Sequence, residues 1–153
     1  MAEFNIKTLN KLFIDWIVRD ERCILSKENG NSKILVTNGI VGYFLPESQI
    51  LISRQSINGE GYGIFDDFKF EKPLLDTMTL EQHGGKTLRK FISQYDDKDK
   101  DFEVYVNDKL LKHFKDCYFW SMGPKKQVLV TRVIDADKPD DVVGLVMPIN
   151  RTW

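Results

Sequence analysis

The sequence predicts a single α+β domain in which amphipathic helices pack on an antiparallel sheet. Three observations support this fold class. The chain has 153 residues, and 42% of them are hydrophobic, which suits one domain with a sizeable core. Residues 4–19 carry apolar side chains at helical spacing. The last third of the chain ends in three apolar segments of strand length, at 117–123, 127–135 and 142–149.

The first segment, residues 4–19, is predicted to be an amphipathic helix. Its apolar stripe, with spacings of three and four, consists of Ile6, Leu9, Leu12, Phe13, Trp16 and Ile17. The opposite side carries Lys7, Lys11, Asp15 and Arg19, each four residues apart. Asn5 is a suitable N-cap for this helix.

Strands follow this helix. Residues 23–28 and 32–37 flank Asn29-Gly30-Asn31, and Asn-Gly between apolar runs predicts a hairpin. Further strands are predicted at 40–45, 49–54, 64–71 and 102–106.

Two more helices are predicted. The first covers 78–94, although Gly84-Gly85 weakens its first half by about 1 kcal/mol per glycine relative to alanine, so that it starts properly only at Lys86. The charged run at 96–101 is predicted to be an exposed loop. The second helix covers 107–115 and leads into the three final strands. These strands are apolar on both faces, so both faces need a cover.

Composition excludes several classes of function. The net charge is −1 and the pI is near 6.1, so the whole molecule is not attracted to DNA or to an anionic membrane. No apolar run reaches the roughly 18 residues of a membrane span. The N-terminus lacks the pattern of a signal peptide, and two cysteines are too few for a disulfide scaffold. We therefore expect a cytoplasmic protein with buried thiols.

No cofactor is predicted from the chemistry-bearing residues. The four soft metal ligands, Cys23, His83, His113 and Cys117, include no closely spaced pair of the kind that structural zinc uses, so no metal is expected. The segment 83–87, HGGKT, hints at a phosphate cradle, but the full GxxxxGK[ST] pattern is absent. No catalytic signature surrounds a nucleophile either. The sequence therefore predicts no enzyme, while a small enzyme with an unrecognised pocket stays open.

Basic residues mark both predicted terminal helices. The first helix exposes Lys7, Lys11 and Arg19, and the last helix presents Lys109, Lys112 and Lys115. Two such helices could together follow a phosphate backbone without reading the bases. The alternative is that these lysines serve only solubility, as on most surface helices.

The end of the chain resembles the end of a bacterial DNA sliding clamp, the polymerase III beta subunit. The resemblance covers residues 105–149 and depends on Asn107, the paired leucines Leu110 and Leu111, and the stretch Leu145-Val146-Met147-Pro148-Ile149. That family ends in a motif close to V-V-M-P-M-R. The chain departs from the family in three ways: its middle segment is longer than one clamp domain needs, Asn150 occupies the terminal arginine position, and there is room for one domain rather than three.

The resemblance implies a function and two sites. The two lysine-bearing helices would face DNA. The strand with Leu145, Met147, Pro148 and Ile149 would border a groove that receives short peptide motifs of partners, whereas ordinary core packing is the alternative for Leu145 and Met147. The leading hypothesis is a non-catalytic clamp-like protein that binds double-stranded DNA loosely, or docks a replication-type protein or further copies of itself. A protein-interaction module with no nucleic-acid role is the runner-up.

Overall fold

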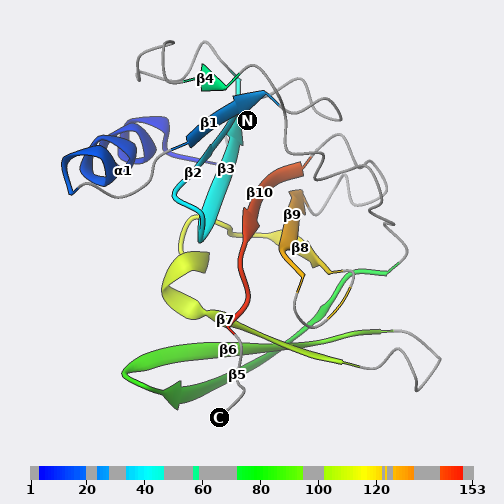
Figure 1. Ribbon diagram of the computed structural model, residues 1–153. Coiled ribbons are helices and arrows are strands. Elements are labelled where there is room, and N and C mark those ends of the chain that lie inside the picture. Colours follow the sequence, from blue (N-terminus) through cyan, green and yellow to red (C-terminus); the bar gives the residue numbers. More distant parts are fainter. Residues whose placement is uncertain are drawn as a thin grey trace.

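In the residues that it describes, the structure, a computed structural model, contains two β-sheets, one α-helix and a short 3-10 helix (Figure 1). It describes residues 4–19, 24–27, 34–46, 57–58, 72–94, 102–121, 123, 126–132 and 142–149. Within these residues the fold is mostly β, which agrees with the predicted α+β class in its coarse form. The predicted strands at 49–54 and 64–71, the turn at 29–31, the loop at 96–101 and Cys23 lie outside the described residues.

The N-terminal helix α1 (Ile6–Val18) confirms the first prediction. The side chain of Asn5 caps it by accepting a hydrogen bond from the Thr8 backbone N–H at 3.2 Å. Leu9, Phe13 and Trp16 are buried, as the apolar stripe requires. No helix in the described residues is long and apolar enough to span a bilayer.

The larger sheet has seven described strands, which form two three-stranded meanders joined side by side and one short additional strand at the edge of the first meander. Its strand order is β4-β1-β2-β3-β10-β9-β8. The strands are β1 (Ile24–Lys27), β2 (Ile34–Thr37), β3 (Val41–Leu45), β4 (Ile57–Asn58), β8 (Cys117–Trp120), β9 (Val128–Arg132) and β10 (Val142–Val146). All neighbours are antiparallel except β1 and β4. The antiparallel pairing predicted for the two strands of the 23–37 hairpin and for the C-terminal meander is therefore confirmed in the described residues.

The smaller sheet overturns the helix predicted over 78–94. Its strands are β5 (Leu75–His83), β6 (Lys86–Ile92) and β7 (Glu103–Asn107), in that order. Gly84 and Gly85, with φ angles of 54° and 79°, form the two-residue turn between the paired residues His83 and Lys86. Two successive residues with positive φ are the signature of a tight hairpin turn, and the glycines that weaken a helix are what this turn needs.

The helix predicted over 107–115 is also wrong, because only a single 3-10 turn forms, η4 (Asp108–Leu111). The Asn107 side chain accepts a hydrogen bond from the Lys109 backbone N–H at 3.2 Å and starts this turn. Phe114 follows this turn, and its backbone N–H donates to the Leu111 carbonyl at 2.9 Å. A bond between residues three apart is of the 3-10 type, whereas an α-helix bonds residues four apart.

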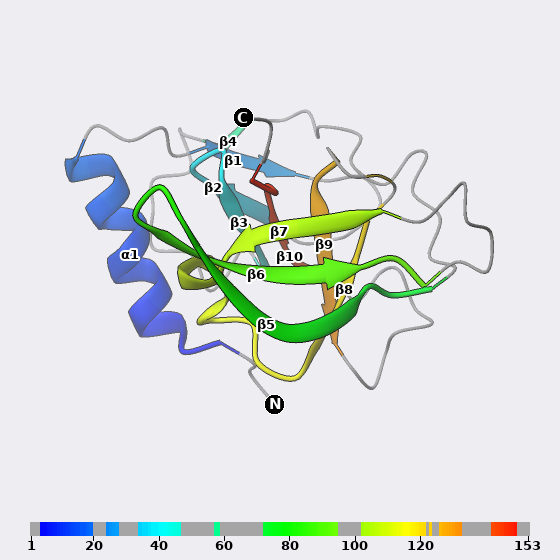
Figure 2. The ribbon, with the colours of Figure 1, turned by 90° about the horizontal axis from the view of Figure 1, so that it is seen from below.

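The two sheets stack, and the core lies between them (Figure 2). One face of the larger sheet is covered by α1 over β2 and β3, and by the smaller sheet over β8 and β9. Phe91 of β6 meets Phe119 of β8 with ring centroids 5.0 Å apart. A second buried cluster lies on the opposite face of the larger sheet and consists of Leu35, Phe44, Trp120, Leu129, Val142 and Leu145. The prediction of apolar residues on both faces is confirmed, but a sheet provides much of the cover that was expected from helices.

The segment after β10 connects the two sheets. The Met147 backbone N–H donates to the Ile40 carbonyl at 2.7 Å, next to β3 of the larger sheet. The Ile149 backbone N–H donates to the Tyr105 carbonyl at 2.7 Å, on the outer edge of β7. Residues 147–149 therefore form a clip, named here the C-terminal clip, between one sheet and the other (Figure 1).

Candidate functional site

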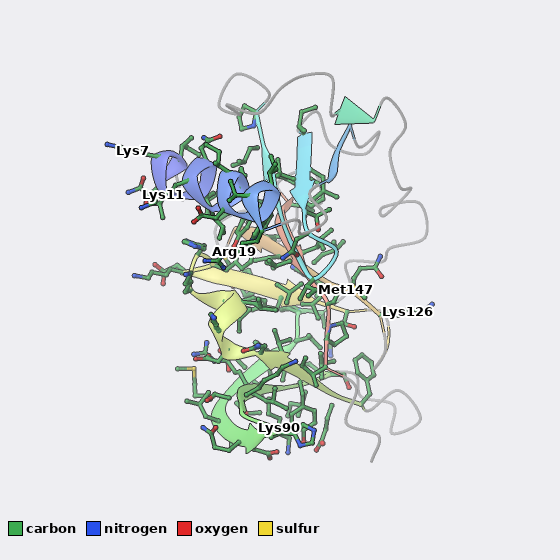
Figure 3. The ribbon with its side chains drawn as sticks, turned by 60° about the vertical axis from the view of Figure 1, so that its left-hand side comes forward. Lys7, Lys11, Arg19, Lys90, Lys126 and Met147 are labelled. Atoms are coloured by element: carbon green, nitrogen blue, oxygen red, sulfur yellow. The ribbon has the colours of Figure 1, made fainter. Side chains whose placement is uncertain are left out.

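The predicted basic residues are all on the surface. Lys7, Lys11 and Arg19 are exposed along and just after α1 (Figure 3). Lys109, Lys112 and Lys115 are exposed in and after η4. These six residues are named here the basic surface. Because η4 is so short, its three lysines lie on a turn and the segment after it rather than along one helix.

An aromatic cluster connects α1 with the segment that follows η4. Phe4, which precedes α1, packs edge-on against Phe114 with ring centroids 5.8 Å apart. Tyr43 of β3 stacks on Phe114 at 5.2 Å and contacts Phe13 of α1 at 5.9 Å. His113 packs edge-on against the same tyrosine at 5.8 Å. Segments about 100 residues apart in sequence therefore meet at the Tyr43 side chain of the larger sheet.

Burial controls the titration of two members of this cluster. Burial raises the pKa of Tyr43, so its hydroxyl stays protonated at neutral pH. Burial also lowers the pKa of His113, and the neighbouring Lys112 cation lowers it further. His113 is therefore mainly uncharged at neutral pH and adds little to the charge of the basic surface.

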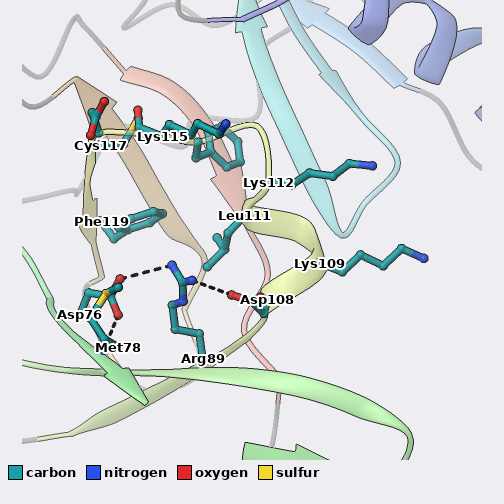
Figure 4. Close-up of a pocket in the computed structure, with 12 residues that line it drawn as sticks. Asp76, Met78, Arg89, Asp108, Lys109, Leu111, Lys112, Lys115, Cys117 and Phe119 are labelled. Atoms are coloured by element: carbon teal, nitrogen blue, oxygen red, sulfur yellow. Dashed lines mark hydrogen bonds and ion pairs between the residues drawn. The ribbon is translucent and has the colours of Figure 1, made fainter. Parts of the chain in front are cut away.

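A cavity of about 650 Å³ lies between the two sheets beside η4 (Figure 4). The smaller sheet contributes Asp76, Met78 and Arg89, and β8 contributes Cys117 and Phe119. The rest of the wall comes from η4 and the residues that follow it, namely Asp108, Lys109, Leu111, Lys112, Phe114, Lys115 and Asp116. This cavity, named here the η4 cavity, therefore adjoins one half of the basic surface.

Arg89 forms the centre of a charged cluster in this wall. Its Nη1 lies 3.4 Å from Asp76 Oδ2, and its Nη2 lies 2.9 Å from Asp108 Oδ1. The contact with Asp108 is an ion pair without hydrogen-bond geometry, since Asp108 Oδ1 has no hydrogen-bond partner. All three side chains are about three-quarters shielded from solvent, so the pairs are screened less than at an open surface.

The segment that hinted at a phosphate cradle lines a second cavity, of about 500 Å³. Gly85, Lys86 and Thr87 face Asn107, Asp108 and Lys109 across it. The Thr87 hydroxyl already accepts a hydrogen bond from Gln82 Nε2 at 2.8 Å. The segment is a hairpin turn, so the prediction of a late-starting helix at this point is wrong.

The predicted partner groove contains one buried residue and three that are partly or well exposed. Leu145 is 6% exposed and packs in the second core cluster, as core packing would place it. Met147 is 38% exposed and lies beside the exposed Ile40, to which its backbone is bonded. Pro148 and Ile149 are half-buried. Other residues line the two cavities described above, and the peptide groove stays a prediction.

The soft metal ligands are distributed over separate elements. His83 ends β5, His113 lies against Tyr43, and Cys117 begins β8. Within the described part of the chain, no three histidine, cysteine, aspartate or glutamate residues gather as a metal site would need.

Met78 and Arg89 line the cavity but were not predicted as site residues, because 78–94 was interpreted as a helix. No sequence pattern marked the other unpredicted lining residues, Asp76, Asp108, Phe114, Asp116 and Phe119. The Gly-Gly pair between alternating residues was the signal that would have predicted a hairpin and placed Arg89 in a central strand.

Comparison with known proteins does not assign this chain to a family. No protein-family model, curated protein or solved structure matches this chain.

Proposed function

We propose that this protein is a non-catalytic, clamp-like protein that binds the phosphate backbone of double-stranded DNA loosely through the basic surface. The observation that carries the proposal is the aromatic junction of Phe4, Tyr43 and Phe114, which connects the start of α1 with the segment that follows η4, so that the two elements bearing these basic residues pack on the same sheet. Each half of the basic surface offers three cationic side chains. The six together are enough to replace the counterions of several phosphates.

The electrostatic setting supports contact with phosphates rather than with bases. Lys7, Lys11 and Lys109 are exposed, and these lysines form no ion pair with another described residue. Lys90, by contrast, is bound to Glu103 at 3.0 Å. Ammonium groups on flexible stems suit phosphate contacts, which position a protein on DNA without reading its sequence.

The topology supports the clamp-like part of the proposal. The resemblance leads us to expect a helix followed by three antiparallel strands, and in the described residues this order occurs once with an α-helix and once with a single 3-10 turn in its place. The first unit is α1 with β1, β2 and β3, and the second is η4 with β8, β9 and β10. The last strands of the two units pair with each other, so Gly42 lies opposite Leu145 and Gly144 lies opposite Tyr43.

The test measures binding of a fluorescent duplex of about 25 base pairs by anisotropy, from low to moderate salt. We expect micromolar or weaker affinity, with a slope of log K against log salt of about −3 to −5, for the wild type. Charge reversal of either half, Lys7→Glu with Lys11→Glu or Lys109→Glu with Lys112→Glu, should weaken binding and reduce the slope by about two.

Lys126→Glu is the matched control. Lys126 is exposed and lies on the opposite side of the molecule from Lys7 and Lys11 (Figure 3). Its reversal changes the net charge by the same amount per residue but should leave the slope nearly unchanged. The proposal is refuted if the duplex does not bind at low salt, or if Lys126→Glu weakens binding as much per charge as the other substitutions.

A further inference from the structure

Backbone strain converges on the η4 cavity. Among the described residues, two that are not glycine have a positive φ, Met78 at 57° and Asp116 at 54°. Both line this cavity. A left-handed conformation is costly for residues with a Cβ, and such strain gathers where a structure holds a ligand or a reacting group.

Unsatisfied polar atoms converge on the same place. Within the described residues, the buried side-chain atoms that lack a hydrogen-bond partner are Arg89 Nε and Asp108 Oδ1. Both residues belong to the wall of the η4 cavity. Buried polar atoms are rarely left without partners. Asp108 Oδ1 still lies 2.9 Å from Arg89 Nη2, so Arg89 Nε is the buried donor of this wall that has neither a hydrogen bond nor an ion pair within the described residues.

The wall has an apolar floor and a cationic rim. Leu111, Phe114 and Phe119 are 5–7% exposed and form the floor, while Met78 is 72% exposed at the mouth. Lys109, Lys112 and Lys115 lie along the η4 side. In Figure 4 the Lys109 and Lys112 stems extend away from Arg89, and a lysine stem is flexible enough to adopt other orientations when an anion binds.

The balance of charge favours an anion. Asp76 and Asp108 are occupied by Arg89, which leaves Asp116 as the remaining lining carboxylate beside three lysines. A cavity of about 650 Å³ is in the range of those that hold compact organic ligands.

We propose that the η4 cavity is a binding site for a compact organic anion. The apolar or aromatic body of the ligand lies on Leu111, Phe119 and Met78. Its charged group is bound by the cationic rim of Lys109, Lys112 and Lys115. A nucleotide and an apolar carboxylate share this chemistry. The proposal goes beyond DNA binding and does not depend on it, although the two sites share lysines.

The test uses two fluorescent probes with the same aromatic body, 1-anilinonaphthalene-8-sulfonate and its uncharged analogue N-phenyl-1-naphthylamine. Binding of the sulfonate should be at least about fivefold tighter. Met78→Ser should weaken both probes, because it removes apolar contact at the mouth. Lys112→Glu should weaken the sulfonate alone. Met78 and Lys112 are exposed, so both variants should retain the wild-type circular dichroism spectrum.

Val18→Ser is the control for non-specific probe binding. Val18 is 78% exposed on α1, near the exposed Ile14 and Ile17, where an apolar dye could also adhere. The proposal fails if Val18→Ser weakens the sulfonate while Met78→Ser does not, or if both probes bind equally. Lys7→Glu with Lys11→Glu should leave probe binding unchanged even if it abolishes DNA binding, so the two proposals can fail separately.

Displacement of the sulfonate identifies the source of the ligand. Displacement by adenosine monophosphate indicates a nucleotide, and displacement by octanoate indicates an apolar carboxylate; either result supports the site. Inorganic phosphate tests the charged group alone. If neither organic anion displaces the probe, or if inorganic phosphate does so equally well, the proposed site is refuted.

Discussion

At the scale of single residues, Gly144 leaves the space in which the Phe114 ring packs against the larger sheet. It lies in β10 opposite Tyr43, and the ring of Phe114 rests directly on it. A Cβ at this position would collide with the Phe114 ring and would lie 2.8 Å from the Gly42 carbonyl oxygen. The missing side chain therefore creates the space in which the aromatic junction forms.

Gly144→Ala should destabilise the protein by about 1–3 kcal/mol, because overpacking displaces either Phe114 or the paired strand. Urea denaturation at equilibrium measures this loss. Gly123→Ala is the matched control, since its Cβ would lie 3.4 Å from the flexible Lys126 side chain, an ordinary contact. Adding Phe114→Leu to Gly144→Ala should cost less than the two single changes summed, and additive losses would contradict the steric explanation.

His113 gives the fold a pH dependence. Burial and Lys112 lower its pKa in the folded state below the ordinary value of 6.5, to which it returns on unfolding. As the pH falls through about 6.5, the unfolded chain binds a proton that the folded chain does not yet bind. Stability should therefore decrease as the pH falls through this window and should stop decreasing, for this residue, below the folded pKa.

Denaturation at about pH 7.5 and about pH 5.5 measures the effect, and the imidazole resonances of His113 give its pKa directly by NMR. His113→Gln should flatten the pH dependence of stability in this window. Lys112→Met should raise the pKa only in part, because burial is the larger cause. An unchanged pH dependence in His113→Gln would disprove this assignment.

At the scale of elements, the β5–β6 hairpin depends on the conformation of its turn. Neither Gly84 nor Gly85 has a neighbouring atom within 4 Å of the place where a Cβ would stand, so any cost of substitution there comes from the backbone. Gly84→Asn should be nearly neutral, because asparagine tolerates the left-handed region. Gly84→Val should cost about 1–2 kcal/mol.

Thermal unfolding monitored by circular dichroism compares these two variants. Amide hydrogen exchange of β5 and β6 then tests whether the loss in Gly84→Val is local to the hairpin. Equal stability of the valine and asparagine variants would show that the turn does not need its positive φ angle.

The edge strand β5 is protected by its own side chains. The Met78 backbone N–H donates to Asp76 Oδ1 at 2.9 Å, and the Thr79 backbone N–H donates to the Thr77 hydroxyl at 3.2 Å. The pairing of β5 with β6 is also irregular between Asp76 and Leu80. Bulged edges with internally bonded N–H groups resist pairing with another chain, so the strain at Met78 accompanies a protected edge.

At the scale of the whole molecule, local patterns predicted the elements that local forces determine. The stripe and cap of α1, the pairing of β1 with β2 and the C-terminal meander all formed because the spacing of the apolar residues agrees with the fold there. The 78–94 segment failed because its apolar residues fit both a helix and a strand. The turn at Gly84-Gly85 and pairing with distant β7 decided between them.

The candidate sites were predictable to different degrees. Lys7, Lys11 and Arg19 could be placed on the surface because they lie on a helix with a clear apolar stripe. The η4 cavity could not be predicted, because it brings together Asp76, Arg89 and Phe119 from three separate strands. Long-range packing of this kind leaves no periodic trace in a sequence.

The C-terminal clip gives the stretch Val146-Met147-Pro148-Ile149 a role in the stability of the whole molecule. Its two backbone hydrogen bonds connect Ile40, next to β3, with Tyr105 of β7, and so tie one sheet to the other. Truncation after Val146 should therefore be compared with truncation after Ile149, because their difference isolates residues 147–149. The shorter chain should be less stable by roughly 2 kcal/mol, since two hydrogen bonds are lost and their acceptors lose their partners.

Urea denaturation gives the difference in stability, and amide exchange in β7 and β6 shows where it arises. If the clip holds the sheets together, protection should fall across the smaller sheet, well beyond Tyr105. A loss of protection confined to the residues next to Tyr105 would mean that these hydrogen bonds only complete the edge of β7 and do not hold the two sheets together. The same pair of truncations bears on the predicted partner groove. The Met147 and Ile149 backbone N–H groups already bond the two sheets, so they are not free to pair with a peptide. The exposed Met147 side chain is then what this segment offers to a partner.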